Sequence, residues 1–191
     1  MATDAGDDAP LVQRARGGDA AAFAELAERH APRLLRFLQT MTGDDHTAED
    51  LRQETLQRAL TRLDQVREDR RFASWLLAIA CNACRNHLRR ELQRHHLGDD
   101  ALAKVAAGRH SALSSLVRRE DALRLALALD RLPILLREAF VLFVVEGLPY
   151  AEIAAITEVA EGTLQVRVHR AKALLRQQLG DLVDTVWTRS P

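Results

Sequence analysis

Apolar side chains recur along most of the chain at the spacing of an amphipathic helix, not at the alternation of a strand. The first such stripe follows Asp19, a good N-cap, and ends at Gly43. Its inward positions are Phe23, Leu26, His30, Leu34, Phe37 or Leu38, and Met41. Pro32, in the middle, predicts a kink or a division into two helices. Because no convincing run alternates apolar and polar residues, the pattern predicts an all-α protein.

Two further helices are predicted in the first half of the chain. One opens at Thr47, with Asp50 three residues further on, as in a capping box. Its inward positions are Leu51, Thr55, Leu56, Ala59 and Leu63. The other covers residues 72–94 and gathers arginines toward its C-terminal half. Its apolar positions are Trp75, Leu76, Ile79 and Ala83.

The organisation of the chain follows from where this periodicity stops. Residues 95–118 lose it and contain glycines and serines, which is typical of a flexible linker. Residues 1–10 carry three acids and no base, and they predict a disordered acidic N-terminus. We therefore expect two small helical domains, over residues 11–94 and 119–187.

Four helices are predicted after the linker. One ends at Pro133, and a second covers residues 134–145 and is closed by Gly147. The last two cover residues 150–156 and the chain from residue 161 onward, and only a few residues separate them. This close pairing fits a helix-turn-helix; an ordinary helical hairpin with a charged outer face has the same pattern.

The last helix has two different faces. Its apolar face holds Leu164, Val168, Ala171 and Leu175. Its start, opposite face and flanks present side chains that can reach base edges and phosphates in a major groove. These candidate DNA-binding residues are Thr163, Gln165, Val166, Arg167, His169, Arg170 and Lys172.

Charge is balanced over the chain and uneven along it. The 191 residues carry 27 Lys and Arg against 27 Asp and Glu. Residues 71–94 hold five arginines and one acid, and residues 162–176 hold four bases and no acid. Two basic segments on a neutral chain indicate a polyanion touched at two places; solvated helix faces are the alternative interpretation.

Several function classes are not expected. The longest apolar runs, residues 75–81 and 139–145, are far shorter than the about 20 residues of a membrane span. The first residues are not typical of a secretory signal, so the expected compartment is the cytoplasm. We find no phosphate-binding glycine loop, nucleophile elbow or zinc-protease motif, and we expect neither catalysis nor a cofactor.

Two cysteines leave one chemical alternative open. Cys81 and Cys84 are followed by His87, a spacing that suggests a metal or redox site. Tetrahedral zinc would need a fourth ligand, and a disulfide within one helix would be strained. The simpler interpretation is two small, half-buried side chains that pack against Trp75.

Two stretches of the chain resemble one known family. Residues 147–175, with Glu152-Ile153-Ala154, Glu161-Gly162-Thr163 and the run 167–172, closely resemble region four of the extracytoplasmic-function (ECF) sigma factors of bacterial RNA polymerase. Residues 22–38, 45–55 and 72–82, with Arg89-Arg90, are similar to region two of the same proteins. The two matches cover about residues 11–94 and 119–180, in the family's order and spacing.

The resemblance implies a role for each basic or acidic face. The acidic and amide-bearing face that meets the polymerase clamp in the family corresponds to Asp45, Glu49, Asp50, Gln53 and Glu54. Contacts to the melted minus-ten strand correspond to Asn82, Arg85, Asn86, Arg89 and Arg90. A serine is usual in the family where this chain has Val166, which offers an apolar contact to a thymine methyl instead.

The resemblance thus implies an initiation factor whose partners are core RNA polymerase, promoter DNA and an anti-sigma factor. The downstream promoter box would be bound as a single strand and the upstream box as duplex. Two alternatives use the same residues. One is a stand-alone helix-turn-helix regulator, and the other is a decoy that binds polymerase or an anti-sigma factor without initiating transcription.

Overall fold

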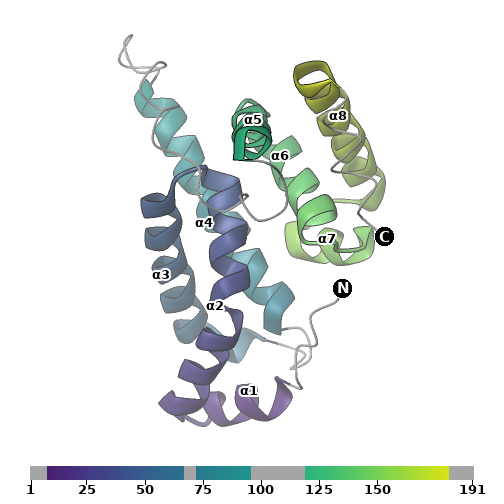
Figure 1. Cartoon of the computed structure of the whole chain (residues 1–191). Coiled ribbons are helices and arrows are strands. Elements are labelled where there is room, and N and C mark those ends of the chain that lie inside the picture. Colours follow the sequence, from purple (N-terminus) through teal and green to yellow (C-terminus); the bar gives the residue numbers. More distant parts are fainter. Residues whose placement is uncertain (1–7, 67–71, 96–118, 181–191) are drawn as a thin grey trace.

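The computed structural model describes residues 8–66, 72–95 and 119–180, and every regular element in these ranges is a helix (Figure 1). The all-α expectation is confirmed. The N-terminal half consists of α1 (Ala9–Arg16), α2 (Ala20–Thr42), α3 (Asp45–Thr61), the 3-10 turn η1 (Leu63–Gln65) and α4 (Phe72–His95). The C-terminal half consists of α5 (Arg119–Asp130), α6 (Ile134–Phe140), the π-helical turn η3 (Val141–Val145), α7 (Tyr150–Thr157) and α8 (Glu161–Leu179).

Helix α2 is the centre of the N-terminal half and packs against α1, α3 and α4. Asp19 caps it as predicted, because its Oδ1 accepts hydrogen bonds from the N–H groups of Ala21 and Ala22. Of the two outcomes predicted for Pro32, a kink or a division, the division is wrong, since α2 continues through that residue as one helix. Pro32 lies on the exposed side, while the opposite stripe is buried and holds the helix together. The stripe consists of Leu26, Leu34, Phe37, Leu38 and Met41.

The N-cap of α3 lies three residues before the predicted one. Asp44, not Thr47, caps the helix, and its Oδ2 accepts hydrogen bonds from Thr47 N at 2.9 Å and Thr47 Oγ1 at 2.6 Å. Thr47 is thus a donor in the first turn instead of the N-cap residue. Both residues are good caps, and the left-handed turn at Gly43 places the aspartate first.

The N-terminal boundary also needs a correction. Asp8 and the two residues after it, which we assigned to the disordered terminus, lie at the start of α1. Asp8 is buried, and its carboxylate contacts two side chains of α2, Arg29 Nη1 at 2.8 Å and His30 Nε2 at 2.8 Å. Pairing with a cation and an imidazole compensates for its burial and attaches α1 to α2. Residues 1–7 lie outside the described residues.

The helices of the C-terminal half follow the predicted pattern. Gly147 closes η3 with a positive φ of 69°, and α7 begins directly after Pro149. The turn between α7 and α8 passes through Glu158 in the left-handed conformation, with φ 57°. Most of the predicted linker, residues 96–118, lies outside the described residues. The end of the predicted second domain, after residue 180, also lies outside them.

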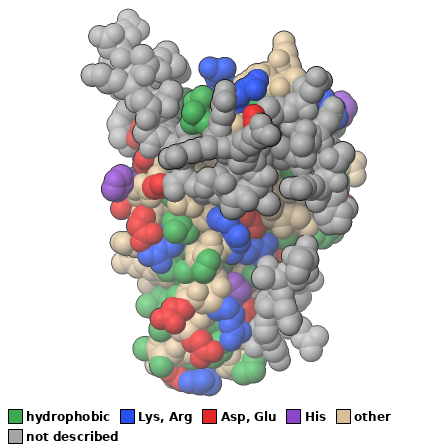
Figure 2. Space-filling view, viewed as in Figure 1, with side chains coloured by type: hydrophobic (Ala, Val, Ile, Leu, Met, Phe, Trp, Pro, Cys, Tyr) green, Lys and Arg blue, Asp and Glu red, His purple; other side chains and the backbone are tan. Residues whose placement is uncertain are grey.

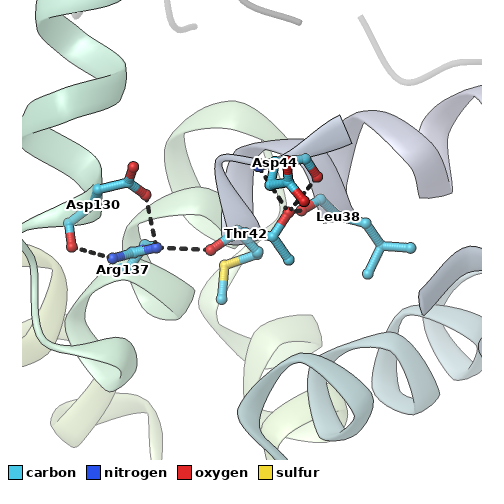
Figure 3. A network of polar contacts seen from close by, with 6 residues as sticks. Leu38, Thr42, Asp44, Asp130 and Arg137 are labelled. Atoms are coloured by element: carbon cyan, nitrogen blue, oxygen red, sulfur yellow. Dashed lines mark hydrogen bonds and ion pairs between the residues drawn. The ribbon is translucent and has the colours of Figure 1, made fainter. Parts of the chain in front are cut away.

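The two halves are in contact along one side of α2 and α4. Helix α5 lies against α2, and α6 and α7 lie against α4. The central contact is the buried guanidinium of Arg137 on α6, whose Nη1 donates to the carbonyl of Met41 at the end of α2, 2.7 Å away (Figure 3). Both amino groups of Arg137 also contact Asp130, through its carboxylate and its backbone carbonyl.

Gly43 allows this close approach. Its φ of 69° lies in the left-handed region, and a Cβ there would be 2.8 and 2.9 Å from the two carboxylate oxygens of Asp130. Gly147 has the same φ and no atom within 4 Å of the equivalent position. Both glycines therefore need the left-handed backbone. They differ because Gly43 lies against Asp130 of the other half, whereas Gly147 has no such neighbour.

We expect Gly43→Ala to destabilise the protein more than Gly147→Ala. The left-handed backbone costs both variants about 1–2 kcal/mol, and Gly43→Ala adds the displacement of Asp130. Thermal or urea unfolding of the two variants measures the difference. Equal losses of stability would contradict the contact between Gly43 and Asp130.

Candidate protein and nucleic-acid interfaces

The predicted acidic face lies on α3, which packs against α2 and α4. Asp45, Asp50 and Gln53 are exposed, and Glu49 and Glu54 are half-buried. None of the five side chains is buried, so all of them lie on the solvent-exposed half of α3. Figure 2 shows acidic side chains along the α3 edge of the molecule, with basic side chains among them.

Two arginines on α3 moderate the charge of this face. Arg52 Nε donates to Glu49 Oε2 at 2.9 Å, and Arg58 forms an ion pair with Glu54. Hydrogen bonding to Arg52 lowers the pKa of the Glu49 carboxyl, so this group stays ionised. Of the four carboxylates in this set, those of Asp45 and Asp50 have no arginine partner on α3 in the described part of the chain. Asp45 accepts a hydrogen bond from Gln39.

The face of α8 that we predicted to contact DNA is exposed to solvent. Its apolar side is buried against the rest of the C-terminal half, with Leu164 1%, Val168 2% and Leu175 0% exposed. The opposite side is open to solvent, and Val166 is 49% exposed although it is apolar. The exposed members of the predicted set are Thr163, Gln165, Val166, His169 and Arg170.

The two flanking cations of α8 are partly held by the protein itself. Arg167 and Lys172 are half-buried. Lys172 Nζ lies 5.4 Å from the ring centroid of Phe143, and Phe143 stacks on Tyr150 with centroids 4.4 Å apart. Sequence reasoning missed this aromatic support, because the three residues belong to three different elements.

The predicted strand-binding residues on α4 divide into two groups. Asn82, Asn86, Arg89 and Arg90 are exposed. Arg85 is half-buried instead, because its guanidinium lies between the two halves of the molecule. Arg85 Nη2 donates to Asn82 Oδ1 at 2.7 Å, and Arg85 Nε lies 3.3 Å from Glu138 Oε1.

Trp75 packs against the core. It is half-buried, and its ring lies 5.9 Å from that of Phe72, centroid to centroid, in a tilted arrangement. Phe72 in turn lies 5.3 Å from the buried His30 ring. Trp75 is therefore a packing residue at the start of α4.

The cysteines are more buried than we predicted. Cys81 and Cys84 are free thiols with 0% exposure. Burial and the Glu138 carboxylate raise the pKa of both thiols, that of Cys84 to about 12. Within the described ranges we find no cluster of three or more His, Cys, Asp or Glu side chains arranged to hold a metal ion. The packing interpretation of the cysteines is the one that this geometry favours.

Comparison with protein families gives two matches. The family model of sigma-70 region 2 matches residues 26–94, and that of sigma-70 region 4 matches residues 122–175. The first match contains α3 and α4, and the second contains the helix-turn-helix of α7 and α8. None of the helices in the described part of the chain is long and apolar enough to cross a membrane.

Individual proteins match over most of their length. RNA polymerase sigma factor CarQ of Myxococcus xanthus is 35% identical, over 90% of this chain and 97% of that protein. ECF RNA polymerase sigma factor SigW of Bacillus subtilis is 29% identical, over 90% of this chain and 96% of that protein. The sigma factor RpoE of Bartonella quintana, solved in complex with the anti-sigma factor NepR, superposes with a TM-score of 0.70 at 27% identity, over 83% of this chain and 97% of that chain.

We expect both native thiols to resist a disulfide-exchange reagent at pH 8. The reactive species is the thiolate. Burial raises the pKa of both thiols, which disfavours the thiolate, and it also keeps the reagent away from the sulfur atoms. Their modification should be at least about a hundredfold slower than in the urea-unfolded protein. A cysteine placed at the exposed position Gln57, as Gln57→Cys, is the matched control and should react at once. Fast reaction of the native thiols would reopen the redox hypothesis.

Proposed function

The chain belongs to the ECF subfamily of sigma-70-type RNA polymerase sigma factors, and from this membership we propose that it directs core RNA polymerase to a specific set of promoters. The polymerase supplies the chemistry, and we expect no catalytic activity from this chain itself. Its site of action would be the cytoplasm, where it would meet polymerase and DNA.

Docking on polymerase is assigned to the exposed face of α3. Carboxylates and an amide suit a basic protein surface and repel the DNA backbone. Asp45 and Asp50 are the most available charges, since Glu49 and Glu54 are paired with arginines of the same helix. These two aspartates should therefore steer the encounter with the polymerase clamp.

Promoter DNA is assigned to two helices. The exposed Asn82, Asn86, Arg89 and Arg90 of α4, together with Arg85, would hold the single-stranded minus-ten element. The exposed face of α8 would read the minus-thirty-five element as duplex in the major groove. The observation that best supports the proposal is that the α3 and α8 faces are both accessible on one chain.

Control by an anti-sigma factor is part of the proposal. The structural relative RpoE was solved with the anti-sigma factor NepR, and we extend this type of partner to the present chain. A formal net charge of zero also limits the affinity for DNA, because few phosphates are neutralised beyond the two basic segments. Promoter selection would then occur mainly in the complex with polymerase.

Run-off transcription on a genomic fragment library, with and without this protein, tests the proposal. We expect new start sites that share two sequence elements.

Asp50→Arg should weaken binding to core polymerase by about tenfold or more, because it places a cation against a basic surface. The matched control is Asp64→Arg, on the exposed turn η1 outside this face. For the unmodified protein in the run-off experiment, binding to core polymerase without new start sites would favour the decoy. Absence of binding would favour the stand-alone regulator.

Val166 is expected to set part of the promoter preference. It is the exposed apolar side chain on the recognition face, so it can contact a thymine methyl where a serine would form a hydrogen bond. Val166→Ser should change the preferred base at one position of the minus-thirty-five element, with a discrimination of about 1–3 kcal/mol. Transcription from a library randomised in that element measures the change, and an unaltered preference would refute it.

A further inference from the structure

Two aromatic rings and a lysine meet at one flank of α8. Phe143 lies in the π-helical turn η3, Tyr150 begins α7, and Lys172 lies in the second half of α8. The rings of Phe143 and Tyr150 are stacked, with centroids 4.4 Å apart and planes inclined by 13°. Lys172 Nζ lies over the Phe143 ring, 5.4 Å from its centroid. All three side chains are half-buried, so the cluster lies at the surface of the C-terminal half.

The backbone between the two rings brings them together. The N–H of Leu148 donates to the carbonyl of Leu142 at 3.1 Å and folds the chain back directly after the turn that contains Phe143. Gly147, with a φ of 69°, supplies the left-handed residue that this reversal needs. Tyr150 then follows as the first residue of α7. Main-chain hydrogen bonds thus set the positions from which the two rings stack.

Lys172 belongs to the stripe of α8 that is proposed to face DNA. At 100° per residue, Gln165, His169 and Lys172 fall within a sector of about 60°. Gln165 and His169 are exposed, whereas Lys172 is half-buried where it lies against Phe143. The aromatic pair therefore supports one member of the proposed recognition stripe.

The position of Lys172 along α8 fits a phosphate contact. A recognition helix reaches base edges with its N-terminal residues. Lys172 comes seven residues after Gln165, which places it about 10 Å further along the helix axis. The major groove is about 12 Å wide, so a residue at this distance comes close to the phosphate backbone at the border of the groove. An ammonium group with three N–H donors suits a phosphate and does not distinguish one base from another.

An aromatic support lowers the entropy that such a contact costs. A lysine side chain has many rotamers and loses much of its freedom when it binds an anion. A ring face attracts an ammonium group and restricts it before DNA is bound. A restricted group then loses less conformational entropy on binding, which is the general effect of preorganisation. A ring and a phosphate can hold one ammonium group from different sides, so the two contacts are compatible.

We propose that Phe143 and Tyr150 are positioning residues that hold Lys172 for a phosphate beside the minus-thirty-five element. This inference rests on the proposed function, because it takes α8 as the helix that binds the upstream element. Neither ring has to touch DNA. Both act through Lys172, so their effect on duplex binding depends on the presence of that lysine.

A double-mutant cycle on the free, full-length protein tests this dependence. Fluorescence anisotropy with a short duplex of mixed sequence measures binding over a range of salt concentrations. Lys172→Gln should reduce the slope of log affinity against log salt by about one, since one phosphate contact is lost. Phe143→Leu should weaken binding about two- to fivefold at low salt. In the Lys172→Gln background, Phe143→Leu should weaken binding no further.

Three more variants separate positioning from a general loss of packing. Tyr150→Leu removes the other ring and should also weaken binding only while Lys172 is present. Phe23→Leu replaces a half-buried ring of α2 and should leave duplex binding unchanged. Arg176→Gln removes an exposed cation one turn after Lys172, and in that background Phe143→Leu should keep its full effect. Thermal unfolding gives the temperature below which every variant is folded, and binding is measured there.

Any of three results would overturn the inference. The first is an unchanged salt slope in Lys172→Gln. The second is unchanged affinity in both Phe143→Leu and Tyr150→Leu. The third is an equal loss of affinity from these ring substitutions with and without Lys172, because rings that only stabilise the C-terminal half would act independently of the lysine.

Run-off transcription by the unmodified protein is measured in parallel. If transcription occurs and the cycle shows no coupling, this inference fails and the proposed function stands. If the cycle shows coupling and transcription does not occur, the positioning of Lys172 stands for duplex DNA and the proposed function fails.

Discussion

One buried guanidinium at the C-terminal end of α2 determines how the two halves of this protein lie together. The last carbonyls of a helix lack partners in the helix, and they carry the negative end of its dipole. Here Gly43 N bonds to the carbonyl of Gln39, Thr42 Oγ1 to that of Leu38, and Arg137 Nη1 to that of Met41. Arg137 thus satisfies a helix end of one half with a charge from the other half, and Asp130 holds it in place. Since Arg137 and Glu138 are neighbours, this contact also sets the position of the glutamate next to α4.

The consequence is that the three candidate interfaces differ in accessibility. The α3 face and the α8 face point away from the contact between the halves, and their predicted residues are mostly exposed. The α4 surface is divided between an exposed stripe and a covered stripe, and Arg85 lies on the covered one. The predicted polymerase-binding face is therefore open to solvent, and the predicted strand-binding face is open only in part.

Most of the helices and two of the three faces could be predicted from the sequence, because they depend on neighbours within a few positions. Asp19 and Gly43 delimit α2, and Gly147 closes the helix before α7, by local capping rules. The recognition face of α8 follows from a 100° step alone. Predictions failed where two local signals competed. Asp44 and Thr47 are both good caps, and the burial of the α2 stripe outweighed the hydrogen bond lost at Pro32.

What the sequence determined by itself is the set of helices, the residues on each face and the resemblance that led to the family. What only the tertiary structure decided is which of those residues are available. Arg85 and Glu138 belong to different halves, as do Arg33 and Glu146, so no helical spacing relates them. The environment of a charged side chain depends on which surface folds against it, and helical periodicity carries that information only across about one turn. The pairing of Arg85 with a carboxylate was therefore visible only once the two halves had been placed against each other.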